Sequence, residues 1–592
     1  MNHGLIGNCM VAALVDDEGT LDWLCLPRFD GEPVFHALVG AGGGHPHDGA
    51  FRVTLEEGAK KTEQRYDDNS AVVVTRLHAA EGAIEIVDFA PRFELHGRMY
   101  RPQMVIRRIR PISGRPRVRI ALRPRFSWGA EAPQVVRGSN HLRFEGPVQT
   151  LRLTTDAPLD YILAERPFNL DQPYDLVFGA DESLAEHPRE IAESFLSQTL
   201  GYWRRWSQRL AVPSEWQDAV IRAAITLKLC SYEPTGAIVA AITSSIPEAP
   251  DSGRNWDYRY CWVRDAFFTV RALNSLAATR TLANYYQWLM NLVADSGGGH
   301  IQPVYGVGLE RHLTESVASG LEGYRGMGPV RIGNQAHEHF QNDVYGSVIL
   351  GAAPAFFDRR LLLQTGWSAF EQLEPLGEQA FRLHDAPDAG IWELRTRARV
   401  HTSSAVMCWA ACDRLARVAA HLGARERATL WRERADLVRD RILAEAWSER
   451  RRAFVESFGG QTLDASVLLM GEVGMLDKDD PRFAATVDTL SQVLGRGPHM
   501  LRYEEADDFG EPEVGFNLCA FWRVDALARI GRHQEAREYF EALLAVRNPL
   551  GLMAEDTDFK TGVPWGNFPQ TYSMVGIING AMRLSRPWEG LV

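Results

Sequence analysis

The hydrophobic pattern of this chain changes its period once, near residue 190. Before that point apolar and polar residues alternate: in the run VRIALR, Val118, Ile120 and Leu122 fall on one face and two arginines on the other. Similar runs are AVVVTRLHA, AIEIVDFA, MVIRRIR, NHLRFEG and TLRLTTD, separated by clusters of Gly, Pro, Asp and Asn. Period two with turn residues between the runs is typical of antiparallel sheets. The first part is therefore predicted to be a β-sandwich.

After residue 190 the apolar residues recur at helical spacing. EIAESFLSQTLGYWRRWSQRL reads as a helical connector, and about a dozen helical segments follow. Some, such as SSAVMCWAACDRLA and QTYSMVGIINGAM, are apolar nearly all round, whereas ERATLWRERADLVRDR carries a broad charged face. Buried helices that alternate with half-exposed ones suit two concentric rings, although a plain helical array fits the same pattern. We predict a sandwich over 1–190, a helical linker over 191–212 and a six-hairpin helical toroid over 213–592.

Composition excludes several classes of protein. The net charge of −12 argues against a nucleic-acid surface, which needs a basic stripe. No run of about 18 uncharged apolar residues is present, so we expect no membrane span, and the N-terminus lacks a signal-like pattern. Seven scattered cysteines without a CxxC pair are typical of reduced thiols, which indicates a cytoplasmic protein. Nothing in the sequence indicates the oligomeric state.

Long loops rich in aromatic residues, Gly and charge lie between the helices, and we expect them to follow the inner helices and to carry the function. One of them, NWDYRYCWVRDA, places rings at every second position and then Arg264 beside Asp265. Sugars have apolar faces and hydroxyl rims, so sugar sites combine aromatic platforms with charged hydrogen-bonding groups. Rings alone would also suit a core segment, but the adjoining charges favour a sugar site.

Two glutamates in such loops are candidates for acid and base. Glu393 lies in GIWELR beside Trp392, and Glu555 lies in GLMAEDTDFKTGVPWGNFPQ. Glycoside hydrolysis needs two carboxyl groups. A neighbouring Trp can desolvate a carboxyl and raise its pKa, which suits an acid. With 76 acidic residues in the chain, however, spacing alone does not separate these two from ordinary turn residues.

Five blocks, in order, resemble glycoside hydrolase family 15, the glucoamylase and bacterial trehalase-like group, over essentially the whole chain. They are ALVDDEGTLDWLCLPRFDGEPVF, DYRYCWVRDA, YRGMGPVRIGNQAHEHFQNDVYG, GIWELR and GLMAEDTDFKTGVPWGNFPQ. The resemblance implies a β-sandwich, a helical linker and an (α/α)6 barrel. It implies Glu393 as general acid, Glu555 as general base, and sugar contacts from Tyr258, Tyr260, Trp262, Arg264, Asp265, Arg331, Asn334, Asp343, Tyr345 and Trp392.

The activity that this resemblance implies is inverting, exo-acting α-glucoside hydrolysis without a cofactor or metal. The two carboxyl groups should then lie about 6.5 to 9.5 Å apart. The substrate is expected to be a small α-glucoside: a malto-oligosaccharide, an isomaltose-type sugar or trehalose. One alternative is an inverting disaccharide phosphorylase, against which the intact block around Glu555 argues. The other is a non-catalytic sugar-binding protein, against which the presence of both glutamates argues.

Two departures from the family concern specificity. Ser347 stands where bacterial relatives often carry an acid, and RYEEADDFGEPEVGF differs from their usual loop. We expect both to lie where the leaving half of the substrate binds. The short His pairs, His45 with His47 and His337 with His339, lack the HExxH spacing and are interpreted as loop residues rather than metal ligands.

Overall fold

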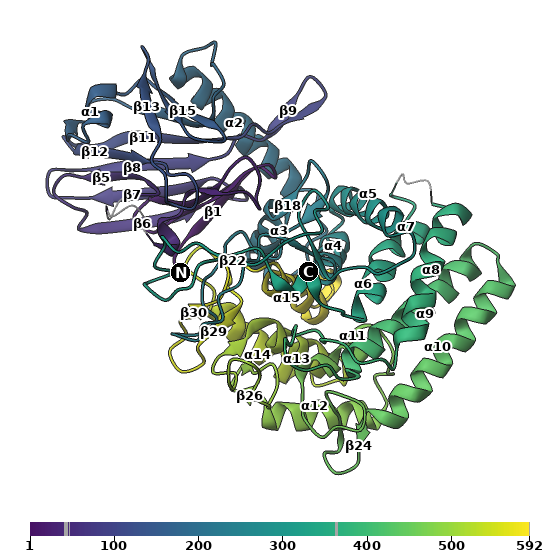
Figure 1. The fold of residues 1–592 in the computed structure, drawn as a ribbon. Helices are drawn as coiled ribbons and strands as arrows, with labels where there is room; N and C mark the ends of the chain where they lie inside the picture. The colour runs from purple at the N-terminus through teal and green to yellow at the C-terminus, as the bar shows by residue number, and fades with distance from the viewer. Residues whose placement is uncertain (41–44, 46–47, 362–364, 591–592) are drawn as a thin grey trace.

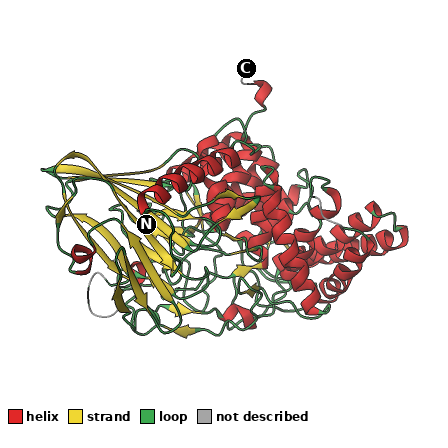
Figure 2. Ribbon diagram, turned by 90° about the horizontal axis from the view of Figure 1, so that it is seen from above, coloured by secondary structure: helices red, strands yellow, loops and turns green. Residues whose placement is uncertain are grey.

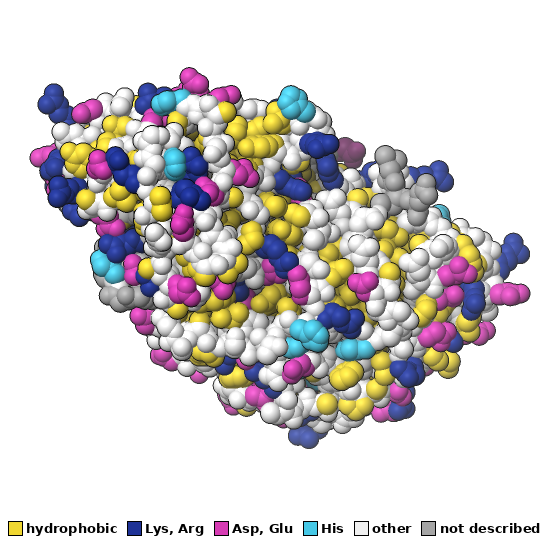
Figure 3. Space-filling model, turned by 45° about the horizontal axis from the view of Figure 1, so that its top comes forward, with side chains coloured by type: hydrophobic (Ala, Val, Ile, Leu, Met, Phe, Trp, Pro, Cys, Tyr) yellow, Lys and Arg dark blue, Asp and Glu magenta, His cyan; other side chains and the backbone are white. Residues whose placement is uncertain are grey.

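The computed structural model of the protein describes residues 1–40, 45, 48–361 and 365–590. The strands gather in the N-terminal part and the helices in the C-terminal part (Figures 1 and 2). Within the described residues, no helix has both the length and the apolar character needed to cross a membrane. On the face drawn in Figure 3, Lys and Arg side chains are interspersed with Asp and Glu side chains, and no basic stripe is visible there.

The N-terminal part is a sandwich of two antiparallel sheets. The first contains β1 (Gly4–Gly7), β2 (Ala12–Val15), β3 (Leu21–Cys25), β5 (Ala50–Leu55), β12 (Arg117–Arg123) and β16 (Phe168–Asn169), with β4 (Pro33–Phe35) beside β3. The second has the order β13 (Gln134–Arg137), β14 (His141–Glu145), β15 (Thr150–Thr155), β17 (Tyr174–Ala180), β11 (Met104–Gly114), β8 (Gly82–Phe89), β7 (Val73–His78) and β6 (Lys61–Tyr66). In β12, Val118, Ile120 and Leu122 are buried and Arg119 is exposed, as the alternation predicts.

A long helix, α2 (Pro188–Ser207), connects the sandwich to the barrel. It begins three residues before the predicted linker, because Pro188 occupies its first turn, where the missing N–H costs no hydrogen bond. Trp203 is fully buried and packs edge-on against the rings of Tyr202 and Trp206. The division of the chain at residues 190 and 212 stays a prediction, since secondary structure alone does not define a domain boundary.

The C-terminal part is an (α/α)6 barrel. The inner ring consists of α4 (Val263–Ser275), α6 (Asp343–Ala352), α9 (Thr402–His421), η3 with α11 (Ala465–Leu468, Leu469–Glu472), α13 (Asn517–Arg529) and α15 (Thr571–Leu584). Each inner helix contacts the next, and α15 contacts α4, so the ring closes. The outer ring consists of α3 (Gln217–Leu229), α5 (Thr279–Ser296), α8 (Trp367–Leu383), α10 (Arg425–Glu445), α12 (Pro481–Val493) and α14 (His533–Ala545).

Burial separates the two rings as the amphipathic patterns predict. Every residue of α6 is buried, whereas α10 buries only Trp431, Ala435, Val438 and Ile442 among its 21 residues. A helix with no polar face must be covered on all sides, so the apolar segments take the inner positions. The alternation of apolar and charged segments in the sequence therefore records the alternation of inner and outer helices along the chain.

The expectation that the long loops follow the inner helices is wrong. An inner helix passes to the next outer helix through as few as three residues, as in 276–278, 422–424 and 530–532. The long loops run the other way, from an outer helix into the next inner helix, as in 230–262 and 546–570. All of them therefore meet at the end of the barrel where the inner helices begin.

The sandwich packs against this barrel and supports one of its loops. The indole N–H of Trp23 donates to the carbonyl of Ile242 at 2.8 Å. The buried Arg259 donates twice to Asp257, at 2.7 and 2.8 Å, and also donates to the carbonyl of Gly31 in the sandwich. Hydrogen bonds to the N-terminal part thus hold the segment that contains the aromatic run in place.

Candidate active site

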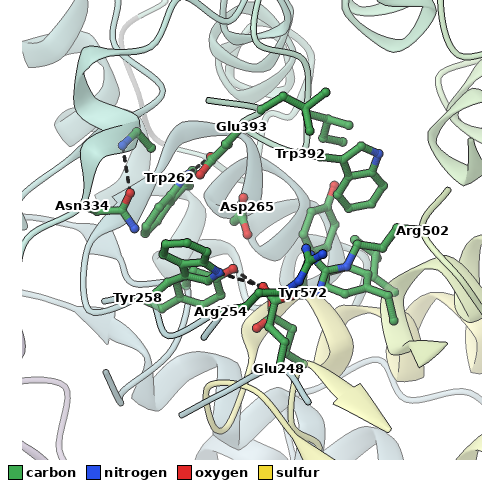
Figure 4. Close-up of a pocket in the computed structure, with 18 of the residues that line it drawn as sticks. Glu248, Arg254, Tyr258, Trp262, Asp265, Asn334, Trp392, Glu393, Arg502 and Tyr572 are labelled. Carbon is green, nitrogen blue, oxygen red and sulfur yellow. Dashed lines mark hydrogen bonds and ion pairs between the residues drawn. The ribbon is translucent and has the colours of Figure 1, made fainter. Parts of the chain in front are cut away.

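A pocket of about 920 Å3, counting its open mouth, lies where the inner helices begin (Figure 4). Asp265 comes from the first turn of α4, Leu518 from the first turn of α13 and Tyr572 from the first turn of α15. The remaining walls are loops that lead into these helices. The pocket therefore combines a rigid floor, built on helix ends, with walls whose sequence can vary.

The structure brings eight of the twelve predicted site residues to the wall of this pocket: Tyr258, Trp262, Arg264, Asp265, Asn334, Trp392, Glu393 and Glu555. They come from four segments that are far apart in the sequence, three of them loops and one the loop that runs into α4. Their convergence is the main structural support for the site predicted from the sequence blocks.

Glu555 lies just before β29 (Asp556–Thr557) and is 1% exposed. The hydroxyl of Tyr258 donates to its Oε1 at 2.8 Å, and its buried Oε2 has no partner among the described residues. Burial, followed by the negative charges of Glu248 and Asp556, raises the pKa of Glu555 well above its usual range, against the opposing charge of Arg502.

A glycine keeps the space beside Glu555 open. Gly566 has a φ of 76°, and a Cβ at this position would lie 2.6 Å from the Cβ of Glu555. Only a residue without a side chain fits both the left-handed backbone and this close approach. The WGN segment of the Glu555 block thus helps to shape the pocket as well as to fold the loop.

Glu393 lies in a tight turn, and its φ of 60° is left-handed, which is unusual for a residue with a side chain. The indole N–H of Trp262 donates to its Oε1 at 2.6 Å, and the guanidinium of Arg264 lies 3.7 Å from the same oxygen. Figure 4 shows Trp262 pointing at this carboxyl group. The neighbouring Trp392 also lines the pocket, but its indole N–H donates to Asp464 at 2.7 Å rather than to Glu393.

The floor of the pocket carries buried polar atoms without hydrogen-bond partners. Asp265 Oδ2 and Arg264 Nε lie 3.5 Å apart as an ion pair, but neither atom makes a hydrogen bond among the described residues, and nor does the hydroxyl of Tyr572. Burial, partly offset by the Arg264 charge, raises the pKa of Asp265 to about 6. Buried polar groups normally have hydrogen-bond partners. A polyhydroxylated ligand such as a sugar would supply partners for all three.

Four predicted site residues lie behind the wall instead: Tyr260, Arg331, Asp343 and Tyr345. Arg331 stacks on the ring of the pocket residue Trp256, with 4.8 Å between guanidinium carbon and ring centroid. Asp343 accepts from Arg264 at 3.3 Å. These two support residues that line the pocket, whereas Tyr260 and Tyr345 are packed into the core.

Ser347 does not lie at the leaving half of the site, contrary to our expectation. It is fully buried in α6, one turn after Asp343, and its hydroxyl donates to the Asp343 carbonyl at 3.2 Å. Because Ser347 lies inside this helix rather than in a loop, it does not line the pocket. The second departure from the family does line the pocket, through Asp507, Asp508 and Phe509.

The histidines of the two His pairs lie in different surroundings. His339 lines the pocket, although the sequence reading took it for an ordinary loop residue. His337 hydrogen-bonds through Nδ1 to the Asn334 carbonyl at 2.9 Å. His45 is described as a loop residue, and His47 lies outside the described residues.

Several pocket residues were not named individually as site residues from the sequence: Glu248, Arg254, Trp256, Arg395, Arg502, Asp507, Asp508, Phe509, Phe516 and Tyr572. Two signals could have found some of them. Trp256 belongs to the aromatic run NWDYRYCWVRDA, which Arg254 directly precedes, and Arg502 opens the RYEEADDFGEPEVGF loop. Tyr572 gives no signal, because it lies buried in an apolar helix, like a core residue.

Comparisons with known proteins show the family of the chain. The family model of the glycosyl hydrolases family 15 matches residues 215–582, and the model "Trehalase-like, N-terminal" matches residues 2–159. The trehalase of Mycolicibacterium smegmatis is 32% identical, over 99% of this chain and 91% of the relative. That of Mycobacterium tuberculosis is also 32% identical, over 99% and 90%, and that of Thermoplasma volcanium is 29% identical, over 98% and 93%.

A solved structure supports the fold over the whole chain. A bacterial glucoamylase complexed with acarbose superposes with a TM-score of 0.71 at 14% identity, covering 98% of this chain and 94% of that one. At this identity the likeness concerns the fold alone. Together with the family models and the relatives, it shows that the chain belongs to glycosyl hydrolase family 15 and is a glycoside hydrolase of the glucoamylase and trehalase type.

Proposed function

We propose that the protein is an inverting α-glucosidase that hydrolyses trehalose, with Glu393 as general acid and Glu555 as general base. The observation that carries this proposal is the placement of both carboxyl groups on one pocket, each fixed by its own aromatic donor. The two donors, Tyr258 and Trp262, pack edge-to-face with 5.3 Å between ring centroids. One short segment thus orients both carboxyl groups.

In the proposed reaction a terminal α-glucose occupies the floor of the pocket near Asp265. Glu393 donates its proton to the glycosidic oxygen as the bond to C1 breaks. Glu555 takes a proton from a water molecule that attacks C1 from the opposite face. With trehalose and one water, the attacked ring leaves as β-glucose and the other ring as α-glucose. Proton exchange with solvent then restores both carboxyl groups.

The relatives favour trehalose over malto-oligosaccharides and isomaltose-type sugars. All three relatives named above are trehalases and match nearly the whole chain, including the sandwich. The N-terminal match is to a trehalase-like domain. The glucoamylase likeness is far lower in identity, so it carries no argument about the substrate.

A panel of sugars tests this proposal. Glucose release would be followed with trehalose, maltose and isomaltose in phosphate-free buffer, and then with added phosphate. We expect hydrolysis of trehalose to be the fastest. Faster hydrolysis of maltose would overturn the substrate assignment, and glucose 1-phosphate formed only with phosphate would indicate a phosphorylase.

We also propose that the protein works in the cytoplasm. All seven cysteines are buried and unpaired, which is the usual state of thiols in a reducing compartment. Fractionation of the producing cells, with activity followed in each fraction, tests the location. Activity confined to the medium or the cell envelope would contradict it.

A further inference from the structure

The pocket has a deep end and an open end, and the exposed fraction of its residues marks the direction. Glu555 is 1% exposed, Tyr572 3% and Asp265 8%, whereas Phe509 is 37% exposed. The Glu393 side chain, at 21%, lies between these extremes. Under the proposed function, the glucose that is attacked occupies the deep end, so the leaving sugar extends from Glu393 toward Phe509.

The segment of residues 503–513, which we call the cap loop, supplies Asp507, Asp508 and Phe509 to the pocket wall. Arg254 holds it from below through two hydrogen bonds to Asp507, at 2.5 and 2.6 Å, and a third to the Gly510 carbonyl at 3.0 Å. The backbone N–H of Phe509 also donates to Asp507, at 2.7 Å. Asp507 thus fixes the tip of the cap loop, and with it the position of Phe509.

The cap loop is also tied to the turn that carries Glu393. Asp508 accepts from the backbone N–H of Arg395 at 2.9 Å and from the hydroxyl of Thr396. These residues come two and three positions after Glu393. The aromatic ring at the tip of the cap loop is therefore held beside the acid, on the side where a leaving group departs.

Two rings meet at this place. Phe509 and Trp256 pack edge-to-face, with 5.2 Å between ring centroids and 80° between the ring planes. Trp256 is held rigidly: its indole N–H donates to Glu248 at 2.9 Å, and the guanidinium groups of Arg331 and Arg395 lie 4.8 and 4.6 Å from its ring. A large apolar ring left exposed at the pocket, beside a ring that cannot move, is a surface suited to the apolar face of a sugar.

We propose that Phe509, backed by Trp256, is the platform on which the leaving glucose stacks, and that the cap loop thereby favours a leaving group that presents a ring over one that does not. This inference rests on the proposed function. It assigns a role to the loop in which the chain departs from its family, and it concerns the half of the substrate that Tyr258, Trp262 and Asp265 do not contact.

Three substrates distinguish the contribution of the Phe509 platform to the rate from that of the acid, Glu393. Trehalose needs both, because its leaving group is a sugar that must be protonated. p-Nitrophenyl α-glucoside needs the platform for its ring but little protonation, and α-glucosyl fluoride needs neither. We expect Phe509→Ala to lower kcat/KM about three- to tenfold on the first two substrates, the scale of one aromatic contact, and to leave the fluoride within twofold. Phe509→Tyr should retain the wild-type values.

Two control variants make the result specific. Phe357→Ala removes another exposed ring, 44% exposed, that lies in α7 (Pro354–Phe357) away from this pocket, and it should change none of the three rates. Asp508→Ala loosens the Glu393 turn and should slow trehalose while sparing the nitrophenyl substrate. Equal losses on all three substrates for Phe509→Ala, or no loss on trehalose, would overturn the platform. A wild-type protein that cleaves the fluoride but not trehalose would overturn the proposed function, and maltose and isomaltose would then replace trehalose in the same comparison.

Discussion

Glu555 and Glu393 are held in the pocket by contrasting means. Glu555 is almost fully buried, precedes a short strand and is bounded by Gly566, so its surroundings are rigid and dry. The side chain of Glu393 is 21% exposed and sits in a left-handed turn that a neighbouring loop secures through Asp508. A base that must activate one water gains from a fixed, desolvated position, whereas an acid must stay near the opening through which the leaving group departs. Under the proposed roles, we infer that the base side sets the chemistry and the acid side sets the specificity.

The largest expected effect is the loss of either carboxyl group. Glu555→Gln and Glu393→Gln should each lower kcat by about 10²- to 10⁴-fold on trehalose, because general acid–base catalysis is worth that much. The leaving group of α-glucosyl fluoride needs little protonation. On this substrate, kcat of Glu393→Gln should come close to the wild-type value, whereas kcat of Glu555→Gln should stay low. Steady-state kinetics on both substrates checks this difference. An equal recovery by both variants would contradict the assignment of Glu393 as acid and Glu555 as base.

The aromatic donors come next. Tyr258→Phe removes the hydrogen bond to Glu555, and hydrogen bonds to charged groups are worth about 1.5 to 3 kcal/mol. We expect kcat to fall about tenfold to a hundredfold, with little change in thermal stability. Trp262→Phe removes the donor to Glu393 and should harm trehalose hydrolysis more than fluoride hydrolysis. If both variants affect the two substrates alike, the donors do not act on separate carboxyl groups.

The pH dependence offers a finer comparison. Glu555 must be ionised to act as a base, and its raised pKa means that activity falls as the pH drops through that value. Glu248→Gln removes one of the negative charges that raise this pKa, so the acid limb of the kcat profile should move to lower pH. Glu338→Gln changes an exposed carboxyl group outside the pocket wall and should leave the limb in place. An acid limb that moves to higher pH in Glu248→Gln would contradict the assignment of the base.

The smallest expected effect concerns the tie between the cap loop and the acid. Thr396→Val removes the hydroxyl that donates to Asp508 while keeping the shape of the side chain. One hydrogen bond is worth about 1 kcal/mol, so kcat on trehalose should fall about fivefold. The fluoride rate should not change, because the acid is not needed there. A loss on both substrates would mean that the tie supports the whole pocket rather than the Glu393 turn.

Much of the fold could be predicted from the sequence, because buried faces of strands and helices produce periodic patterns of apolar residues. The alternation around Val118 predicted a strand, and the nearly all-apolar segments of α9 and α15 predicted inner helices. The direction of the long loops could not be predicted, since periodicity locates helices but does not show at which end of the barrel each begins. That required the closed ring itself.

The pocket was predictable where a block of sequence carries its residues together, as with Tyr258, Trp262 and Asp265. The loop RYEEADDFGEPEVGF was expected at the leaving half of the substrate, but the sequence did not single out which of its residues would line the pocket. Phe509 lies in this charged loop without periodicity, and the hydrogen bonds of Asp507 to Arg254 and of Asp508 to the Glu393 turn hold it at the pocket. Trp392 shows the converse: it is adjacent to Glu393 in sequence, but the left-handed turn at Glu393 directs the two side chains to different partners.

The most direct test of the two-carboxylate account is real-time proton NMR of the hydrolysis of trehalose. Inversion at one carbon and retention at the other predict that the first turnovers release α-glucose and β-glucose in equal amounts, before mutarotation mixes them. Early release of α-glucose alone would mean that the attacked carbon keeps its configuration, and it would contradict the roles assigned to Glu393 and Glu555.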